Sequence, residues 1–217
     1  MIDMPKIVAA PSSSGMASHQ HPRQPDDEDS VSYYRLMQLA VQELLIEKQI
    51  FSAADVTAQI AAMDARTSAR GAQVVVRAWV DAAFQARLLA DAPAACAELG
   101  LEVGSLKLIV VADTPDIHNV IVCTLCSCYP RMLLGLPPDW YKSRAYRSRV
   151  VREPRAVLRE LGTALPERVA LRVHDSTADM RYMVLPLRPA GTEGLSEAAL
   201  AKLVTRDSLI GVALVEA

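Results

Sequence analysis

Apolar residues recur at three- and four-residue steps in the first part of the chain, which is the period of an amphipathic helix. The first run follows Ser30 and Ser32, either of which can cap a helix. Its apolar positions are Leu36, Leu39, Ala40, Leu44 and Leu45. A second helix is expected near Ser52, because Asp55 would then lie in the first turn, where a negative charge suits the helix dipole.

The helical pattern is interrupted at residues 68–72. It resumes in a helix expected at residues 81–99, with a break at Pro93 and an end at Gly100. Residues 31–100 are therefore predicted to form an alanine-rich helical arm. Such a thin arm cannot bury a core alone, so we expect it to embrace another subunit or the C-terminal domain of its own chain.

Strand signals begin only in the second half, where runs of β-branched residues replace the helical period. The expected strands are residues 106–111, 119–122, 168–174, 181–187 and 209–215. Helices are expected at residues 153–161, before Gly162, and from Ser196 to Val204. These elements predict an α+β domain at residues 101–217, preceded by the arm.

Residues 1–30 are interpreted as a flexible tail, because they combine four prolines, a serine run and an acidic block without apolar periodicity. The whole chain of 217 residues is 51% hydrophobic, which is enough for a buried core. Its net charge of −2 gives no general attraction to nucleic acid. We find no apolar run of membrane-spanning length and no signal peptide, so a cytoplasmic location is expected.

Three of the four cysteines lie within six residues, in the sequence Cys123-Thr124-Leu125-Cys126-Ser127-Cys128. A structural zinc site usually needs four ligands from two separate knuckles, and the remaining cysteine, Cys96, lies in a helical pattern. A redox pair has the C-x-x-C spacing but lacks the surrounding βαβ pattern.

A third interpretation is a compact metal claw on one tight turn. Three thiolates and the deprotonated backbone amides of Ser127 and Cys128 would give five ligands from six residues. Soft, strongly donating ligands of this kind favour low-spin trivalent iron or cobalt over zinc, and a sixth position would stay open for water or substrate.

This claw sequence resembles that of nitrile hydratase alpha subunits. The resemblance covers roughly residues 31–215. It includes the segments Arg77-Ala78-Trp79-Val80-Asp81, Gly135-Leu136-Pro137-Pro138, Trp140-Tyr141-Lys142, Arg149-Val150-Val151-Arg152, Arg181-Tyr182-Met183-Val184-Leu185-Pro186, Arg188-Pro189-Ala190-Gly191-Thr192 and Leu209-Ile210-Gly211-Val212-Ala213. The family fold implies a helical N-terminal arm and a layered α-β-β-α globular domain.

The resemblance implies a role for each residue of the claw. Cys123 would stay a thiolate, Cys126 would become a sulfinic acid and Cys128 a sulfenic acid, and the amides of Ser127 and Cys128 would complete the metal ligands. Cys126, Ser127 and Cys128 would be catalytic, with the Cys128 oxygen acting as nucleophile or base toward water. Thr124 is similar to the cobalt-type members, so one trivalent cobalt per chain is expected in preference to iron.

The resemblance also implies partners. The chain would act only with one or two beta-type subunits, whose arginines would bind the claw oxygens, and a metallochaperone or activator would load the cobalt. The reaction would be hydration of a small nitrile to its amide. No nucleic-acid or membrane partner is expected.

Two departures from the family pattern leave alternatives open. Arg131 stands where nitrile hydratases usually carry Trp, and Glu102-Val103-Gly104-Ser105 replaces a Gln-containing turn. Arg131 is similar to the residue in thiocyanate hydrolase gamma subunits, which share the cobalt claw and bind an anion. Arg131 is therefore predicted to bind substrate, unless it lies in a subunit interface. A thiol module for metal storage or redox sensing is the non-enzyme alternative.

Overall fold

The computed structural model describes residues 33–104 and 107–217. The chain divides between Ala58 and Gln59 into two units, and each is considered separately below. The predicted tail at residues 1–30 and the two candidate capping serines, Ser30 and Ser32, lie outside the described residues. Within the described residues, no helix is both long enough and apolar enough to cross a membrane.

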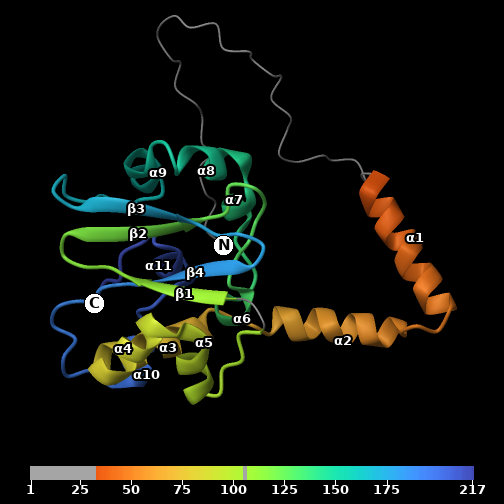
Figure 1. The fold of residues 1–217 in the computed structure, drawn as a ribbon, viewed down its shortest axis with the longest axis horizontal. Helices are drawn as coiled ribbons and strands as arrows, with labels where there is room; N and C mark the ends of the chain where they lie inside the picture. The colour runs from red at the N-terminus through yellow and green to blue at the C-terminus, as the bar shows by residue number, and fades with distance from the viewer. Residues whose placement is uncertain (1–32, 105–106) are drawn as a thin grey trace, which may run out of the picture. The chain divides into compact units, whose positions relative to one another are not determined.

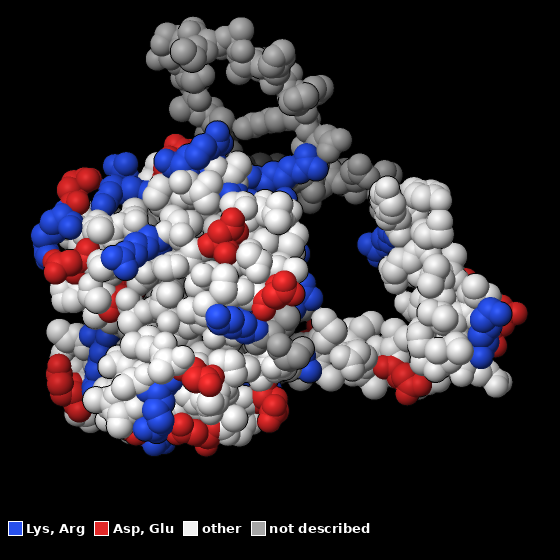
Figure 2. Space-filling view, in the orientation of Figure 1, with Lys and Arg blue, Asp and Glu red and all other residues white. Residues whose placement is uncertain are grey.

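The first unit contains helix α1 (Tyr33–Glu47) and the start of helix α2 (Ala53–Asp64). Ser52 and Asp55 cap α2 reciprocally. The Ser52 amide donates to Asp55 Oδ2 at 2.8 Å, and the Asp55 amide donates to Ser52 Oγ at 3.1 Å. The predicted start of this helix is thus confirmed. No residue of α1 is buried, and Figure 2 shows its surface as mostly uncharged.

The second unit begins with three helices, α3 (Ala69–Val80), α4 (Ala82–Ala90) and α5 (Ala92–Glu98). Helix α3 starts inside residues 68–72, so the predicted interruption there is wrong. Gly71 lies on a packed face, where an added Cβ would come within 2.7 Å of Leu209, so this glycine permits close packing against α11 (Arg206–Ile210).

The predicted helix at 81–99 breaks at Asp91 instead of Pro93. Asp91 accepts a hydrogen bond from the Ala94 amide at 3.1 Å and so caps α5. Pro93 lies in the first turn of α5, where its missing N–H leaves no intrahelical bond unmade.

Helices α3 to α5 are part of the core of the second unit. Their buried residues include Val74, Val75, Val76, Phe84, Leu88 and Cys96. The predicted boundary at residue 100 therefore differs from the structure, in which the second unit starts at Gln59. The reason is that α3 carries a strongly apolar face, which is buried within its own chain.

Four strands form two parallel pairs. Strand β1 (Lys107–Ala112) pairs with β4 (Met180–Leu185), and β2 (Ile117–Val122) pairs with β3 (Ala170–Asp175). Four of the five predicted strands are thus confirmed, and so is the mixed α+β class.

The fifth predicted strand, at residues 209–215, is wrong. Thr205 and Ser208 form a capping box that starts α11, and the helix ends at Gly211 with φ +86°. A side chain at Gly211 would overlap the Asn119 carbonyl oxygen, so the β-branched pattern here reflects burial next to β2 and not a strand.

The remaining helices are short. They are α6 (Arg131–Leu134), α7 (Asp139–Lys142), α8 (Arg144–Arg149), α9 (Pro154–Glu160) and α10 (Glu197–Ala201). The predicted caps at Ser196 and Gly162 are confirmed. In Figure 1, α8 and α9 lie beside the β2–β3 pair, and α3, α4, α5 and α10 lie beyond the β1–β4 pair.

Candidate metal centre

The clustered cysteines lie on the turn that directly follows β2. The last three residues of this strand are fully buried, and its parallel register places Val122 opposite Asp175 of β3. The Ser176 amide donates to the Val122 carbonyl at 2.7 Å. The core of the unit therefore fixes the backbone at the point where the cysteine turn begins.

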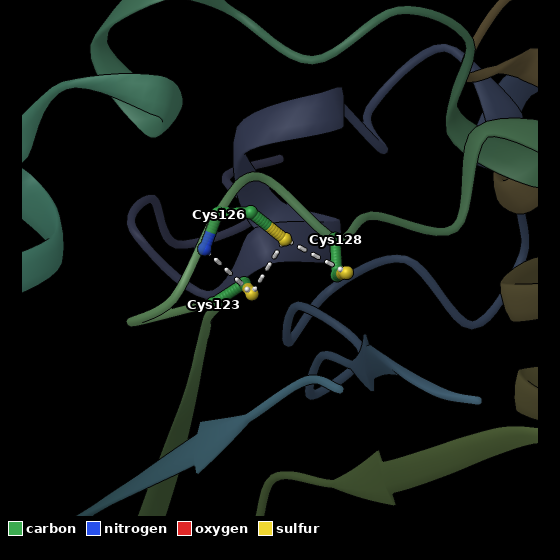
Figure 3. Close-up of side chains that lie close together, drawn as sticks. All are labelled: Cys123, Cys126 and Cys128. Atoms are coloured by element: carbon green, nitrogen blue, oxygen red, sulfur yellow. Dashed lines mark hydrogen bonds between the residues drawn. The ribbon is translucent and has the colours of Figure 1, made fainter. Parts of the chain in front are cut away.

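The three sulfurs converge. Cys126 Sγ lies 3.5 Å from Cys123 Sγ and 3.2 Å from Cys128 Sγ (Figure 3). All three sulfurs lie within 4.8 Å of one another, although Cys123 is buried, Cys128 half-buried and Cys126 exposed. Leu125, at the outside of the turn, is 87% exposed. One face of the cluster is thus held in the protein while the other is open.

Each thiol in the cluster has its own environment. Hydrogen bonds from Cys128 and Cys123 lower the pKa of Cys126 to about 7. Burial, together with the neighbouring thiols, raises the pKa of Cys128 to about 12. Cys126 therefore loses its proton more easily than Cys128, and a bound metal ion would favour the thiolate form of each.

The donor set fits a soft transition metal. The backbone amides of Ser127 and Cys128 interact with the Cys126 sulfur and help to lower its pKa, so they face the same space as the thiols. Thiolate sulfur with nitrogen donors is the chemistry that iron, cobalt and zinc accept in proteins. Among the residues described, Cys123, Cys126 and Cys128 form the group that could hold a metal ion.

Asp175, at the end of β3, holds the first half of the turn. Its carboxylate accepts from the Thr124 amide at 2.9 Å and from Thr124 Oγ1 at 2.5 Å. Two hydrogen bonds to a charged acceptor fix both the backbone and the side chain of Thr124. Asp175 does not join its neighbours His174 and Ser176 in a catalytic triad; it supports the cysteine turn.

Two buried tyrosines hold the turn from behind. Tyr141 Oη donates to the Cys128 carbonyl at 2.9 Å, and Tyr146 Oη donates to the Ile121 carbonyl at 2.8 Å. Their rings pack with Trp140 and Tyr129 in an aromatic cluster, with ring centroids 4.9 to 6.1 Å apart. The cysteine turn therefore rests on packed aromatic side chains, and the Cys128 carbonyl has a hydrogen-bond donor.

A cavity of about 430 Å³ opens beside the cysteines. Its walls include Cys126, Ser127 and Cys128, and Arg131 at the start of α6. Two further arginines, Arg66 and Arg181, line the same cavity. A pocket of this size suits a small organic ligand. The structure thus brings Arg131 to the same cavity as the cysteines, as the substrate-binding prediction requires.

Other candidate ligands lie elsewhere. Cys96 is buried in α5, where burial raises its thiol pKa to about 11. His118 is bonded to Asp113 at the opposite end of β2, and His174, which lies opposite Ile121, is bonded to Asn119. None of these side chains belongs to the metal-binding cluster.

The sequence prediction missed four residues of the site: Asp175, Tyr141, Arg66 and Arg181. Asp175 directly follows the strand predicted at residues 168–174, a position where loop-facing polar groups gather, and this was the available signal. Arg66 had no comparable signal, because it lies more than fifty residues before the cysteines and reaches the cavity only through the packing of α6.

Converging thiols, adjacent amides and a ligand-sized cavity suit the class of proteins that hold a transition metal on a cysteine loop. Comparison with known proteins narrows this class. The family model for the nitrile hydratase alpha chain matches residues 32–213, and the chain belongs to this family. The predicted resemblance, and with it the prediction of an enzyme subunit, is confirmed.

Three relatives illustrate the kinds of protein to which this chain is similar. It is 56% identical to the alpha subunit of a low-molecular-weight cobalt-containing nitrile hydratase of Rhodococcus rhodochrous, over 66% of this chain and 70% of that one. It is 42% identical to the gamma subunit of thiocyanate hydrolase of Thiobacillus thioparus, over 86% and 82%. A mutant iron-type nitrile hydratase of Comamonas testosteroni Ni1 matches with a TM-score of 0.80 and 44% identity, over 88% and 93%.

Proposed function

We propose that this chain is the alpha subunit of a cobalt-type nitrile hydratase, which hydrates a nitrile to the corresponding amide. The observation that carries the proposal is the convergence of three thiols and two backbone amides beside a cavity of about 430 Å³. The cobalt-containing relative and Thr124 support cobalt over iron. The α-β-β-α layering of the family fold, preceded by an N-terminal arm, is part of the same proposal.

Within this proposal Cys123 remains a thiolate, Cys126 is a sulfinic acid and Cys128 a sulfenic acid. When bound, a trivalent cobalt would act as a Lewis acid toward the nitrile. Oxygen on Cys126 and Cys128 weakens the sulfur donors and places polar atoms at the open side of the cluster. The Cys128 oxygen takes a proton from water or attacks as a nucleophile, while buried Cys123 and the Ser127 amide hold the ligand geometry.

Metal analysis tests the core of this proposal. The complex purified with its beta-type partner and activator is expected to hold about one cobalt per chain. Cys126→Ala should abolish cobalt binding, and because Cys126 is exposed the fold should survive. Cys96→Ala, which removes a thiol outside the cluster, should keep its cobalt. Mass spectrometry of the claw peptide should show three added oxygen atoms, two on Cys126 and one on Cys128.

Two results would count against this centre. Stoichiometric zinc that a mild chelator removes, with unmodified thiols, would favour the metal-storage alternative. A reversible disulfide within the claw that controls another activity would favour redox sensing. Oxygenated cysteines separate the enzyme from both, because neither storage nor a disulfide switch needs them.

Nitrile hydratase alpha subunits act with beta subunits, and we propose that α1 provides part of the contact surface. It carries exposed apolar residues that no core of the described chain covers: Tyr33, Tyr34, Leu36, Met37, Leu39, Val41 and Leu44. Surfaces of this kind mark protein interfaces. The cytoplasmic location, the cobalt-loading activator and the absence of nucleic-acid or membrane partners belong to the same proposal.

Substitution on α1 tests the interface. Leu36→Ser combined with Leu44→Ser should weaken the complex by roughly tenfold or more, since each removes exposed apolar area that association would bury. Co-purification and light scattering would measure the change. Lys48→Ser, a polar substitution just after α1, serves as the control. A complex unchanged by the double substitution would place the beta-type contact elsewhere.

Thiocyanate hydrolysis is the second candidate, because Arg131 lines the cavity and the gamma subunit of thiocyanate hydrolase is a relative. The deciding assay compares thiocyanate, a small aliphatic nitrile and a heteroaromatic nitrile. Turnover of thiocyanate alone would favour the hydrolase. If Arg131 contacts substrate, Arg131→Trp should shift preference toward small apolar nitriles without loss of metal. An unchanged profile would leave Arg131 a role only at an interface.

A further inference from the structure

The cavity beside the cysteines carries positive charge on more than one wall. Its described lining contains three arginines, Arg66, Arg131 and Arg181, and no aspartate or glutamate. The rest of the lining is largely apolar, including Val103, Leu108 and Leu133. Guanidinium groups that gather at one cavity favour an anionic ligand there.

The cavity arginines differ from those arginines of the second unit that form ion pairs. Arg87, Arg149 and Arg155, for example, form ion pairs with glutamates. Within residues 33–104 and 107–217, no carboxylate pairs with Arg66, Arg131 or Arg181 within 4.0 Å. The absence of a carboxylate partner is therefore a shared property of the cavity arginines.

Arg181 and Arg66 are held in different ways. Arg181 donates to the Thr177 and Met180 carbonyls of its own strand region, so backbone oxygens fix its guanidinium. Arg66 Nη1 instead contacts the sulfur of Met132 at 3.1 Å. A thioether is a weak acceptor and carries no charge, so Arg66 keeps its capacity to bind an anion.

Arg66 and Arg131 belong to the same wall of the cavity. Met132, which Arg66 contacts, follows Arg131 in α6. The backbone holds Arg66 close to α6. Thr67 forms a β-bridge with Gly135 at the end of this helix, and a side chain at Gly135 would overlap the Arg66 carbonyl. Arg131 itself is exposed on the cavity side of the short helix.

We infer that Arg66 and Arg131 together form an anion subsite, and that the substrate is a nitrile that carries a carboxylate. This inference rests on the proposed function and specifies its substrate class. Two guanidinium groups that line one cavity suit a carboxylate, and the apolar lining suits a hydrocarbon body between the two polar ends. In the hydration the nitrile carbon gains oxygen and its nitrogen gains two hydrogens from one water molecule, so the carboxylate is unchanged.

The cavity is larger than thiocyanate needs, which favours an extended substrate over that small anion. At about 430 Å³ it falls in the range of pockets that enclose organic ligands. The alternative role for the arginines is to balance the negative charge of the cysteines. That role predicts equal effects on all substrates, whereas an anion subsite predicts an effect that depends on substrate charge.

The test compares 4-cyanobutanoate with its neutral counterpart 4-cyanobutanamide, on the assembled cobalt-loaded complex. Arg66→Met and Arg131→Met keep the apolar stem and remove the charge. Each should lower kcat/KM for the carboxylate roughly ten- to a hundredfold, as expected for a hydrogen bond to a charged group. The loss in kcat/KM for neutral 4-cyanobutanamide should be clearly smaller than for the carboxylate, and the cobalt content should match that of wild type. Arg87→Met, which removes an ion-paired arginine of α4, is the control.

Binding gives a second measurement that does not need turnover. Calorimetric affinity for 4-cyanobutanoate should fall in both variants and be retained better in Arg66→Lys. Equal losses on both compounds, or a wild-type complex that prefers the neutral nitrile or thiocyanate, would overturn the inference. A complex that hydrates neutral nitriles without this preference would leave the proposed function intact. One that hydrates no nitrile and binds no carboxylated nitrile would contradict both.

Discussion

The polar groups near the two ends of strand β2 differ in burial and in bonding partners. At its start, His118 and Asn119 are at least 96% buried, and both are hydrogen-bonded to other groups of the chain. At its end, Cys126 is exposed, and the nearby Arg131 has no carboxylate partner among the residues described. The polar groups at the start of the strand stabilise the fold, whereas those near its end are available to a ligand.

The buried end is a closed network of hydrogen bonds. Asp113 Oδ1 accepts from the Asn119 amide at 2.7 Å and from its side chain at 2.9 Å. His118 Nδ1 lies 3.2 Å from Asp113 Oδ2, and its Nε2 lies 2.8 Å from the Gly211 carbonyl. Both ring nitrogens face acceptors, so the network favours the charged imidazolium form of His118.

The difference shows where rigidity in this chain comes from. The network at His118 and the bonds from Asp175 and Tyr141 all fix backbone on either side of β2. The thiols and cavity arginines contribute little to that framework. Substitutions at the buried end should therefore change stability, and substitutions around the cysteines should change ligand binding.

The largest expected loss of stability follows from breaking the buried pair. His118→Ala removes the side chain that faces Oδ2 of buried Asp113, while the two bonds from Asn119 to Oδ1 remain, and it should lower the free energy of unfolding by about 3–5 kcal/mol. His174→Ala removes one half-buried hydrogen bond, to Asn119 Oδ1 at 2.9 Å, and should cost about 0.5–1.5 kcal/mol. Urea unfolding of both variants would measure these values. Equal losses would mean that the pair contributes no more than one neutral bond.

The same pair makes stability depend on pH. Burial lowers the pKa of His118, but the hydrogen bond and charge of Asp113, with the Gly211 carbonyl, outweigh it and raise the pKa above its usual value. Protonation thus stabilises the folded state below about pH 6.5, and this contribution is lost as pH rises through the raised pKa. The difference in unfolding free energy between wild type and His118→Gln should therefore shrink as the pH rises through the raised pKa.

The contribution of His174 to stability depends on pH with the opposite sign. Burial, and then the charge of Arg172, lowers its pKa, so its contribution is present above about pH 6.5 and lost as pH falls through the lowered value. The difference between wild type and His174→Gln should therefore grow with pH. Two profiles with the same slope would contradict the assignment of charge to the two histidines.

A smaller change should separate support of the cysteine turn from support of the fold. Tyr141→Phe removes the donor to the Cys128 carbonyl, and Tyr146→Phe removes the donor to the Ile121 carbonyl. Each should cost about 0.5–1.5 kcal/mol of stability. Only Tyr141→Phe should shift the electronic absorption of the loaded metal centre. Identical spectra in both variants would show that the Tyr141 bond does not influence the ligand geometry.

Local sequence predicted the parts of this structure that local interactions determine. The cysteine spacing, the Ser52 and Ser196 caps and four strands follow from residues close together in the chain. The helix near the end of the chain was not predicted in this way. Burial of α11 beside β2 gives this segment a β-like composition. The start of α3 was missed because its glycine is needed for packing against Leu209, a contact that no local pattern reveals.

The residues of the candidate site also divide into those that local sequence predicted and those that it did not. The ligand cysteines, Ser127 and Arg131 were predicted because they lie within nine residues of one another. Asp175 and Arg66 come from distant segments, and only the strand register and the bridge from Thr67 to Gly135 bring them to the site. The catalytic roles of Cys126, Ser127 and Cys128 stay predictions.

The burial of Cys96 has a practical consequence for studying maturation. Its thiol is inaccessible and, with a pKa of about 11, almost wholly protonated at neutral pH, so alkylating reagents and oxidants react with it slowly. In the native protein, reagent uptake therefore reports on exposed Cys126 and half-buried Cys128 and not on Cys96. After denaturation, the peptide that contains Cys96 provides an internal mass standard. Oxygen atoms gained during cobalt loading can then be assigned by difference within a single digest.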